Sequence, residues 1–443
     1  MPQARSAIPQ APLDLGFVHE SRFEAGDKSI PTLALGRRLD ELGGLALNVL
    51  EGDVPLPAAL LKTSALHHNR AWMRRYLART GVSIAPHGKT TMAPQLFSLQ
   101  LEDGAWGMTA ATIAHVQLYR RAGVRRIIVA NQVIGTHDLD VLLDEIHSDP
   151  SCDIYFLLDS VAGFERAFEC ASTCRRRIRP LRVLLEVGLE GGRGGVRGRA
   201  AALTLARRIA KAAPHIELAG IECYEGILGG NDARETEARI SELLGAVADV
   251  YAAASRESLF APGERLLTAG GTAYFDLVSA ALTRIAGPYT TIVLRSGCYL
   301  TLDHGFYAGQ IGALLGRLGA NAPPDRLMPA LEVGALVNSV PEPTLAILNF
   351  GKRDAPYDLG LPVPLWRHRR GDAPGSVTLL PPGCTTERLN DQHAYVRIPA
   401  GAFEVGDVGG FGISHPCSLF DRWPHVLEVD DRYTVTGAIK TFF

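Results

Sequence analysis

The sequence of 443 residues contains no run of 18 or more apolar residues, so we expect no membrane span. Neither sign of charge dominates: 45 Lys and Arg face 47 Asp and Glu, and this balance excludes the basic excess typical of nucleic-acid binding. The seven cysteines are odd in number and scattered, which favours reduced thiols over a disulfide framework. Residues 1–17 lack the apolar segment of a signal peptide, and we predict a cytoplasmic protein.

What is present is an ordinary globular composition, with 47% hydrophobic and 21% charged residues. Short apolar runs without period-2 alternation, as expected of parallel strands buried on both faces, occur at 82–86, 106–110, 126–131, 154–159, 182–187, 217–223, 265–270 and 291–297. Amphipathic stretches such as 238–257 separate them. Eight such units predict an α/β protein with a (β/α)₈ TIM-type barrel. An open doubly wound sheet is the alternative, but no Gly-x-Gly-x-x-Gly follows the first strand.

After residue 305 the segments become short, extended in character and punctuated by Gly, Pro and Asp. This pattern predicts a second, mainly antiparallel β domain. We place the barrel at 64–305 and the β domain at 306–443, together with about 1–63, because the run at 57–66 could pair with that domain. Linkers are predicted around 36–50 and 303–325.

Functional residues of such barrels collect at the carboxyl ends of the strands. The first strand is followed by Pro-His-Gly-Lys, which contains His87 and Lys89. A lysine directly after a buried strand would be partly desolvated, which frees its amine to form a Schiff base. A surface-loop lysine is the alternative.

Two glycine-containing turns at the same barrel mouth expose backbone N–H groups suited to a phosphate, namely Gly270-Gly271-Thr272 and Ser296-Gly297-Cys298. Opposite a lysine, they suggest pyridoxal phosphate. Three further side chains are candidates for contact with its ring: Arg193 beside the phenolate oxygen, Arg295 at the pyridine nitrogen and Tyr224 near the ring face. The alternative for Arg193 is a solvated position in the loop, and for Arg295 an ion pair inside the barrel. Tyr224 could instead cap the barrel.

In the β domain, His415 and Cys417 are separated by one residue and can project to one side of an extended segment. Imidazole plus thiolate favours Zn²⁺ over Mg²⁺ or Ca²⁺. An unligated pair is the alternative. Asp391 and His393 could supply a further ligand or a supporting partner.

The motifs that occur in this order are PHGKTTMAPQL (86–96), GMTAATIAHVQLYRRAGV (107–124) with VANQVIG (129–135), LEVGLEGGRGGVR (185–197), TAGGT (268–272), LRSGCYLTLD (294–303), FGKRDAPYDLGLPVP (350–364), NDQHAYVRIP (390–399) and VGDVGGFGISHPCSLFDRW (405–423). They resemble the pyridoxal-phosphate enzymes of the alanine-racemase fold type, in the D-serine dehydratase and D-threonine aldolase branch and close to an amino acid deaminase-like subgroup. The resemblance covers about residues 55–443. It implies that Lys89 is the Schiff-base lysine and that His415 and Cys417 bind Zn²⁺ or another divalent metal.

The resemblance implies a lyase that converts a D-β-hydroxy amino acid, such as D-serine or D-threonine, into a 2-oxo acid and ammonia. The aldolase branch is expected to carry an acidic residue where this chain has Cys417, which favours dehydration. The alternatives are a metal-dependent aldolase that yields glycine and an aldehyde, an amino acid racemase, and a non-catalytic pyridoxal-phosphate carrier. Family members form head-to-tail homodimers, and we expect one here. We expect no nucleic-acid or membrane partner.

Overall fold

The computed structural model describes residues 10–174, 179–230 and 232–443, which form two compact units. The barrel unit comprises the described residues of Met1–Leu13, Tyr76–Lys89 and Gln100–Gly297. The β unit comprises Asp14–Arg75, Thr90–Leu99 and Cys298–Phe443. The chain therefore passes between the two units more often than the predicted boundaries imply.

The barrel unit is built on parallel strands that match the eight predicted runs. They are β2 (Ser83–Ile84), β3 (Met108–Ala110), β4 (Arg126–Gln132), β5 (Asp153–Leu158), β6 (Leu181–Gly188), β8 (Ile216–Glu222), β9 (Arg265–Ala269) and β10 (Thr290–Leu294). Their order is β2-β10-β9-β8-β6-β5-β4-β3, and the short β7 (Val196–Arg197) pairs with β6. A parallel bridge between His87 and Thr109 joins the two ends of this order and closes the barrel.

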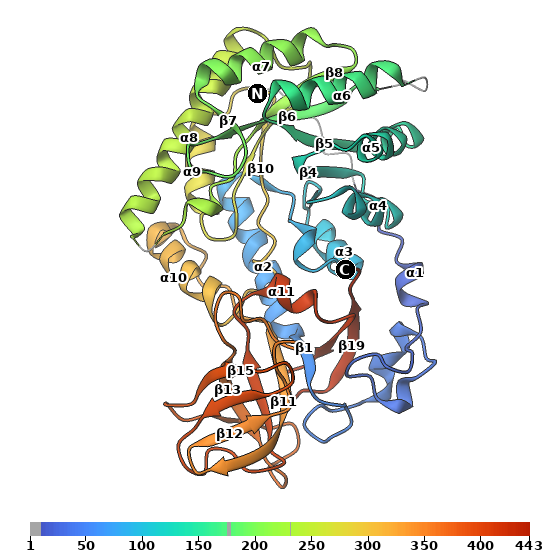
Figure 1. Cartoon of the computed structure of the whole chain (residues 1–443), viewed down its shortest axis with the longest axis vertical. Coiled ribbons are helices and arrows are strands. Elements are labelled where there is room, and N and C mark those ends of the chain that lie inside the picture. Colours follow the sequence, from blue (N-terminus) through green and yellow to red (C-terminus); the bar gives the residue numbers. More distant parts are fainter. Residues whose placement is uncertain (1–9, 175–178, 231) are drawn as a thin grey trace. The chain divides into compact units, whose positions relative to one another are not determined.

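Helices surround these strands (Figure 1). They are α4 (Ile113–Arg121), α5 (Thr136–Ser148), α6 (Val161–Thr173), α7 (Arg199–Lys211), α8 (Ala233–Arg256) and α9 (Phe275–Ile285). The helix predicted at 238–257 is α8, which begins earlier because the Asp232 carboxylate accepts hydrogen bonds from the N–H groups of Arg234 and Glu235. A cluster of buried apolar side chains lies inside the barrel and includes Tyr155, Leu184 and Val293. This packing explains the near-continuous apolar runs of the strands.

The β unit contains a ten-stranded, mainly antiparallel sheet. Its strands are β1 (Ala58–Lys62), β11 (Leu331–Glu342), β12 (Leu345–Leu348), β13 (Val363–His368), β14 (Thr378–Leu379), β15 (Thr385–Leu389), β16 (Ala394–Arg397), β17 (Val408–Gly412), β18 (His425–Val429) and β19 (Val435–Lys440). The predicted pairing of the run at 57–66 is confirmed, since β1 is antiparallel to β11 and parallel to β18. The fold is therefore the predicted barrel plus antiparallel β domain.

The remaining elements are short or connect the sheets. They are α1 (Gly16–His19), η1 (Thr32–Ala34), η2 (Leu39–Leu45), α2 (Thr63–Thr80), η3 (Gly88–Thr90), α3 (Pro94–Glu102), η4 (Gly226–Leu228), α10 (Phe306–Leu318), η5 (Gly319–Asn321) and α11 (Pro416–Phe420). Among the helices of the described residues, none combines the length and the apolar character that a bilayer crossing requires.

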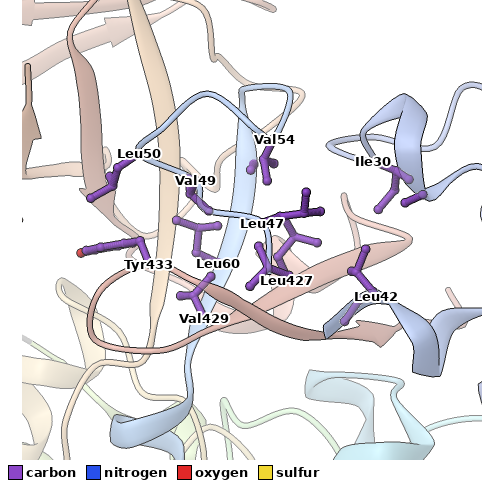
Figure 2. Packing of buried hydrophobic residues seen from close by; sticks show 14 of the residues in the cluster. Ile30, Leu42, Leu47, Val49, Leu50, Val54, Leu60, Leu427, Val429 and Tyr433 are labelled. Atoms are coloured by element: carbon purple, nitrogen blue, oxygen red, sulfur yellow. The ribbon is translucent and has the colours of Figure 1, made fainter. Parts of the chain in front are cut away.

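Both segments predicted as linkers contain helical elements. Residues 36–50 include η2, and Leu42, Leu47 and Val49 are buried against β-strand residues of the β unit (Figure 2). Their apolar side chains are separated by glycines and charged residues without a helix or strand period, so no periodic pattern indicated that they are buried. Residues 303–325 contain α10. The N-terminal segment thus has a structural role: it completes the hydrophobic core of the β unit.

Candidate active site

The ends of β2, β9 and β10 are tied together by backbone hydrogen bonds. His87 N donates to Arg295 O over 3.2 Å, and Arg295 N donates to Gly270 O over 3.2 Å. The hydroxyl of Ser296 also donates to Gly270 O, at 2.8 Å. The carboxyl ends of these three strands, which carry predicted site residues, therefore meet at one edge of the barrel unit.

Lys89 follows β2 in the short helix η3 and is exposed. The expected partial desolvation of its amine is therefore not found, because η3 carries the residue beyond the end of the strand. Exposure leaves the amine accessible to a carbonyl compound that enters the barrel mouth.

Two imidazoles and a guanidinium lie near Lys89. Burial and the neighbouring charges of Lys89 and Arg295 hold the pKa of His87 well below its ordinary value. Burial and Lys89 also lower the pKa of His115, at the start of α4. Both rings are therefore neutral at neutral pH and can only hydrogen-bond, while Lys89 is the exposed basic group at this edge. Sequence reasoning missed His115, although it lies within the motif at 107–124.

Arg295 points into the barrel and forms a buried ion pair with Glu222. One of its terminal nitrogens lies 2.5 Å from Glu222 Oε1, and the two side chains are 5% and 1% exposed. The guanidinium also donates to Cys223 O over 3.1 Å. Burial raises the pKa of Glu222 to about 7 although Arg295 opposes the shift. The inward ion pair, which the sequence left open as the alternative for Arg295, is thus present.

Removing one partner of this pair should be costly. We expect Arg295→Met to lower the free energy of unfolding by about 3–5 kcal/mol, because it leaves the Glu222 carboxylate buried without a cation. The double variant Arg295→Met/Glu222→Gln should recover most of that loss. Denaturant unfolding of the cofactor-free proteins measures the free energy of unfolding of both variants. A double variant no more stable than Arg295→Met would contradict the buried Arg295–Glu222 ion pair.

The turn after β9 carries the first predicted phosphate site. Gly270 has φ +93°, and a Cβ there would lie 2.7 Å from Leu294 Cδ2, so the turn requires glycine. The N–H groups of Gly270 and Gly271 donate to the two carboxylate oxygens of Glu225, at 3.1 and 2.6 Å. These two amides, which we expected to bind phosphate, are therefore occupied by a fully buried carboxylate in this structure. Thr272 is also buried and follows directly.

The glycine-rich loop after β6 places Arg193 over Tyr224. The Arg193 guanidinium lies 4.9 Å from the centre of the Tyr224 ring, and both residues line one pocket together with Glu186 and Leu228. Arg197, which sequence reasoning missed, holds the loop by donating to the carbonyl groups of 192–195, including Gly192 O at 3.0 Å. The structure thus brings together two of the predicted cofactor residues, Arg193 and Tyr224.

In the β unit, His415 and Cys417 belong to a second polar cluster. Cys417 Sγ lies 3.7 Å from Cys298 Sγ and 3.6 Å from the Thr90 hydroxyl. Hydrogen bonds with Cys298, His415 and Thr90 outweigh the opposing effect of burial and lower the pKa of Cys417 well below its ordinary value. Burial lowers the pKa of His415, but hydrogen bonds to Cys417 and Asp358 outweigh burial and raise it to about 9.

The carboxylate beside His415 is Asp358, which sequence reasoning missed. Its Oδ2 lies 2.5 Å from His415 Nδ1. The expected supporting residue Asp391 is exposed in the turn between β15 and β16, where its carbonyl accepts a hydrogen bond from Arg353 N. Within residues 10–174, 179–230 and 232–443, no group of three or more His, Cys, Asp or Glu side chains forms a metal-binding cluster.

The residues of the barrel edge fit pyridoxal phosphate. Nδ1 of His87 is buried and has no hydrogen-bond partner among the described residues. A Cβ on Gly271 would lie 3.3 Å from the Tyr224 ring, so glycine keeps that face open. The exposed Lys89 amine supplies the nucleophile that an aldehyde requires. In the β unit, the imidazole and thiol of His415 and Cys417 are donors that suit Zn²⁺.

A parallel barrel with a lysine at its carboxyl edge, joined to an antiparallel β unit, is the architecture of the alanine racemase fold. Residues 61–273 match the family model of the alanine racemase N-terminal domain, and residues 330–429 match that of a putative serine dehydratase domain. The chain thus matches both domain models, in this order.

The individual relatives are more distant. The chain is 27% identical to a D-threonine aldolase of Arthrobacter sp. over 358 residues, which cover 80% of this chain and 83% of the relative. A D-threo-3-hydroxyaspartate dehydratase of Delftia sp. is 29% identical over 140 residues, 32% of this chain and 35% of the relative. The solved D-threonine aldolase of Filomicrobium marinum superposes with a TM-score of 0.73 at 23% identity, covering 89% of this chain and 97% of that one. This last likeness supports the fold.

Proposed function

We propose that this protein is a pyridoxal-phosphate-dependent lyase of D-β-hydroxy amino acids, and that it dehydrates and deaminates its substrate to a 2-oxo acid and ammonium. The relatives named above are an aldolase and a dehydratase of D-hydroxy amino acids, and the barrel edge offers a site for the cofactor. The observation that carries the dehydratase assignment is Cys417 beside His415, where the aldolase branch is expected to have a carboxylate.

Pyridoxal phosphate, when bound, supplies an electron sink for the bonds at the substrate Cα. Lys89 would hold the cofactor through its amine and, once released by the incoming amino acid, accept the Cα proton. The neutral ring of His87 would offer a hydrogen-bonding group at this edge. Arg295 would place its guanidinium, paired with Glu222, at the same edge. Because Glu225 occupies the N–H groups of Gly270 and Gly271, we assign the phosphate to Thr272 and the backbone of Gly297.

His415 and Cys417 would hold a divalent ion, for which Zn²⁺ is the best match to imidazole and thiolate donors. A Lewis acid of this kind makes a β-hydroxyl a better leaving group. Loss of water and its later return at the imine carbon give a balanced net reaction, in which D-serine yields pyruvate and ammonium. We further propose that the working form is a homodimer.

The test is product analysis of the cofactor-loaded protein with D-serine and D-threonine, before and after treatment with a chelator. Pyruvate or 2-oxobutyrate with stoichiometric ammonium, lost on chelation and restored by Zn²⁺, is the expected result. Glycine and acetaldehyde from D-threonine would instead establish the aldolase, which the 358-residue match to a D-threonine aldolase favours as the second candidate. The absence of products from both substrates would contradict both assignments.

A further inference from the structure

We propose that Asp358 is the positioning residue of the metal site: it holds Nδ1 of His415, so that Nε2 is the nitrogen left for the ion. This inference rests on the metal role of His415 and Cys417 in the proposed function. Asp358 belongs to neither the motif around Lys89 nor the His-Pro-Cys segment, and it lies 57 residues before His415 in the chain.

The contact itself is short and directional. Asp358 Oδ2 lies 2.5 Å from His415 Nδ1. The hydroxyl of Ser418 lies 3.2 Å from the same carboxylate oxygen and 3.0 Å from the same ring nitrogen. A carboxylate can only accept here, so Nδ1 carries the proton of this contact and Nε2 is the nitrogen that an ion can reach once it displaces any proton there. A proton on Nδ1 is what a metal ion requires of a histidine bound through Nε2.

The loop that carries Asp358 is fixed to the segment that carries His415. This loop follows β12, and three side chains of residues 414–423 donate to its carbonyl groups. Ser414 Oγ donates to Gly360 O, Arg422 Nε donates to Lys352 O over 3.0 Å, and Trp423 Nε1 donates to Asp354 O over 2.8 Å. These contacts lie on both sides of Asp358 in the chain. They therefore hold its carboxylate beside the His415 imidazole.

A contribution to overall stability does not account for this arrangement. The side chains of His415 and Asp358 are 23% and 43% exposed. Ion pairs at that level of exposure contribute roughly 0–1 kcal/mol. Orientation of a ligand has a larger effect, since loss of such a supporting partner weakens metal binding by about 10- to 100-fold.

The experiment measures Zn²⁺ affinity by competition with a chromophoric chelator, on the full-length protein. The variants are Asp358→Asn, His415→Ala and the double variant, with Asp358→Glu to restore a carboxylate. The matched control, Asp421→Asn, removes the same charge from the end of α11. Thermal unfolding of each metal-free protein shows whether it is folded.

We expect Asp358→Asn to bind Zn²⁺ about 10- to 100-fold more weakly than the wild type, at an unchanged unfolding temperature. The double variant should bind no more weakly than His415→Ala alone, because Asp358 acts only through His415. Asp358→Glu should recover part of the loss, and Asp421→Asn should match the wild type. Equal affinity of Asp358→Asn and wild type, or additive losses in the double variant, would overturn the inference and leave the metal site standing. A wild type that binds no Zn²⁺ would overturn the metal site and this inference with it.

Discussion

Lys89→Ala should lower the turnover of the cofactor-supplied protein by at least about 10³-fold. The expected loss is this large because the substitution removes both the amine that holds the cofactor and the base that accepts the Cα proton. Lys89→Arg should be equally inactive, since a guanidinium keeps the positive charge but can neither bond to an aldehyde nor accept a proton at neutral pH. Initial rates of 2-oxo acid formation measure the effect.

A matched control is Lys211→Ala, which removes an exposed lysine from α7 in the same unit. It should retain wild-type turnover. A second readout is independent of activity: borohydride reduction fixes the cofactor to the lysine that carries it, and peptide mass mapping then locates the label. In the wild type the label should be on Lys89. Substantial turnover of Lys89→Arg, or a label on another lysine, would contradict the proposed role.

The barrel could be predicted from sequence because each of its strands is apolar on both faces. Runs such as 182–187 and 291–297 therefore stand out between amphipathic helices, and the structure contains β6 and β10 there. The place of Lys89 and Arg295 follows from the same argument, since the carboxyl ends of parallel strands share one edge. What the pattern could not predict is the direction of a side chain, and Arg295 forms an ion pair with Glu222 inside the barrel.

The partners of the predicted site residues were not predictable, because loops distant in the sequence supply them. Glu225 lies 45 residues before the Gly270 amide it binds. Asp358 lies 57 residues before His415, and no local spacing links either pair. Residues 36–50 illustrate the same limit for packing, since their leucines are buried without any regular period. In each case contacts between distant parts of the chain determine what the residue does. A single sequence contains no periodic pattern that indicates such contacts.

The effect of Cys417→Ala should separate the proposed dehydratase from a metal-independent enzyme. We expect kcat/KM for D-serine to fall at least about 10²-fold, because a Lewis acid contributes several kcal/mol and each 1.36 kcal/mol is a factor of ten. A chelator should lower wild-type activity to the same level and have no further effect on the variant. Cys384→Ala, which removes another thiol of the β unit, is the matched control and should behave as the wild type.

Cys417→Asp makes the sharper comparison, since it places a carboxylate where the aldolase branch is expected to have one. If the thiolate favours dehydration, this variant should divert D-threonine from 2-oxobutyrate towards glycine and acetaldehyde while still binding a divalent ion. The measurement is the ratio of 2-oxobutyrate to glycine formed by the variant and the wild type at equal metal occupancy. An unchanged ratio in Cys417→Asp would show that the residue beside His415 does not determine which bond breaks. Residual activity of Cys417→Ala that is still sensitive to a chelator would show that Cys417 is not an essential ligand.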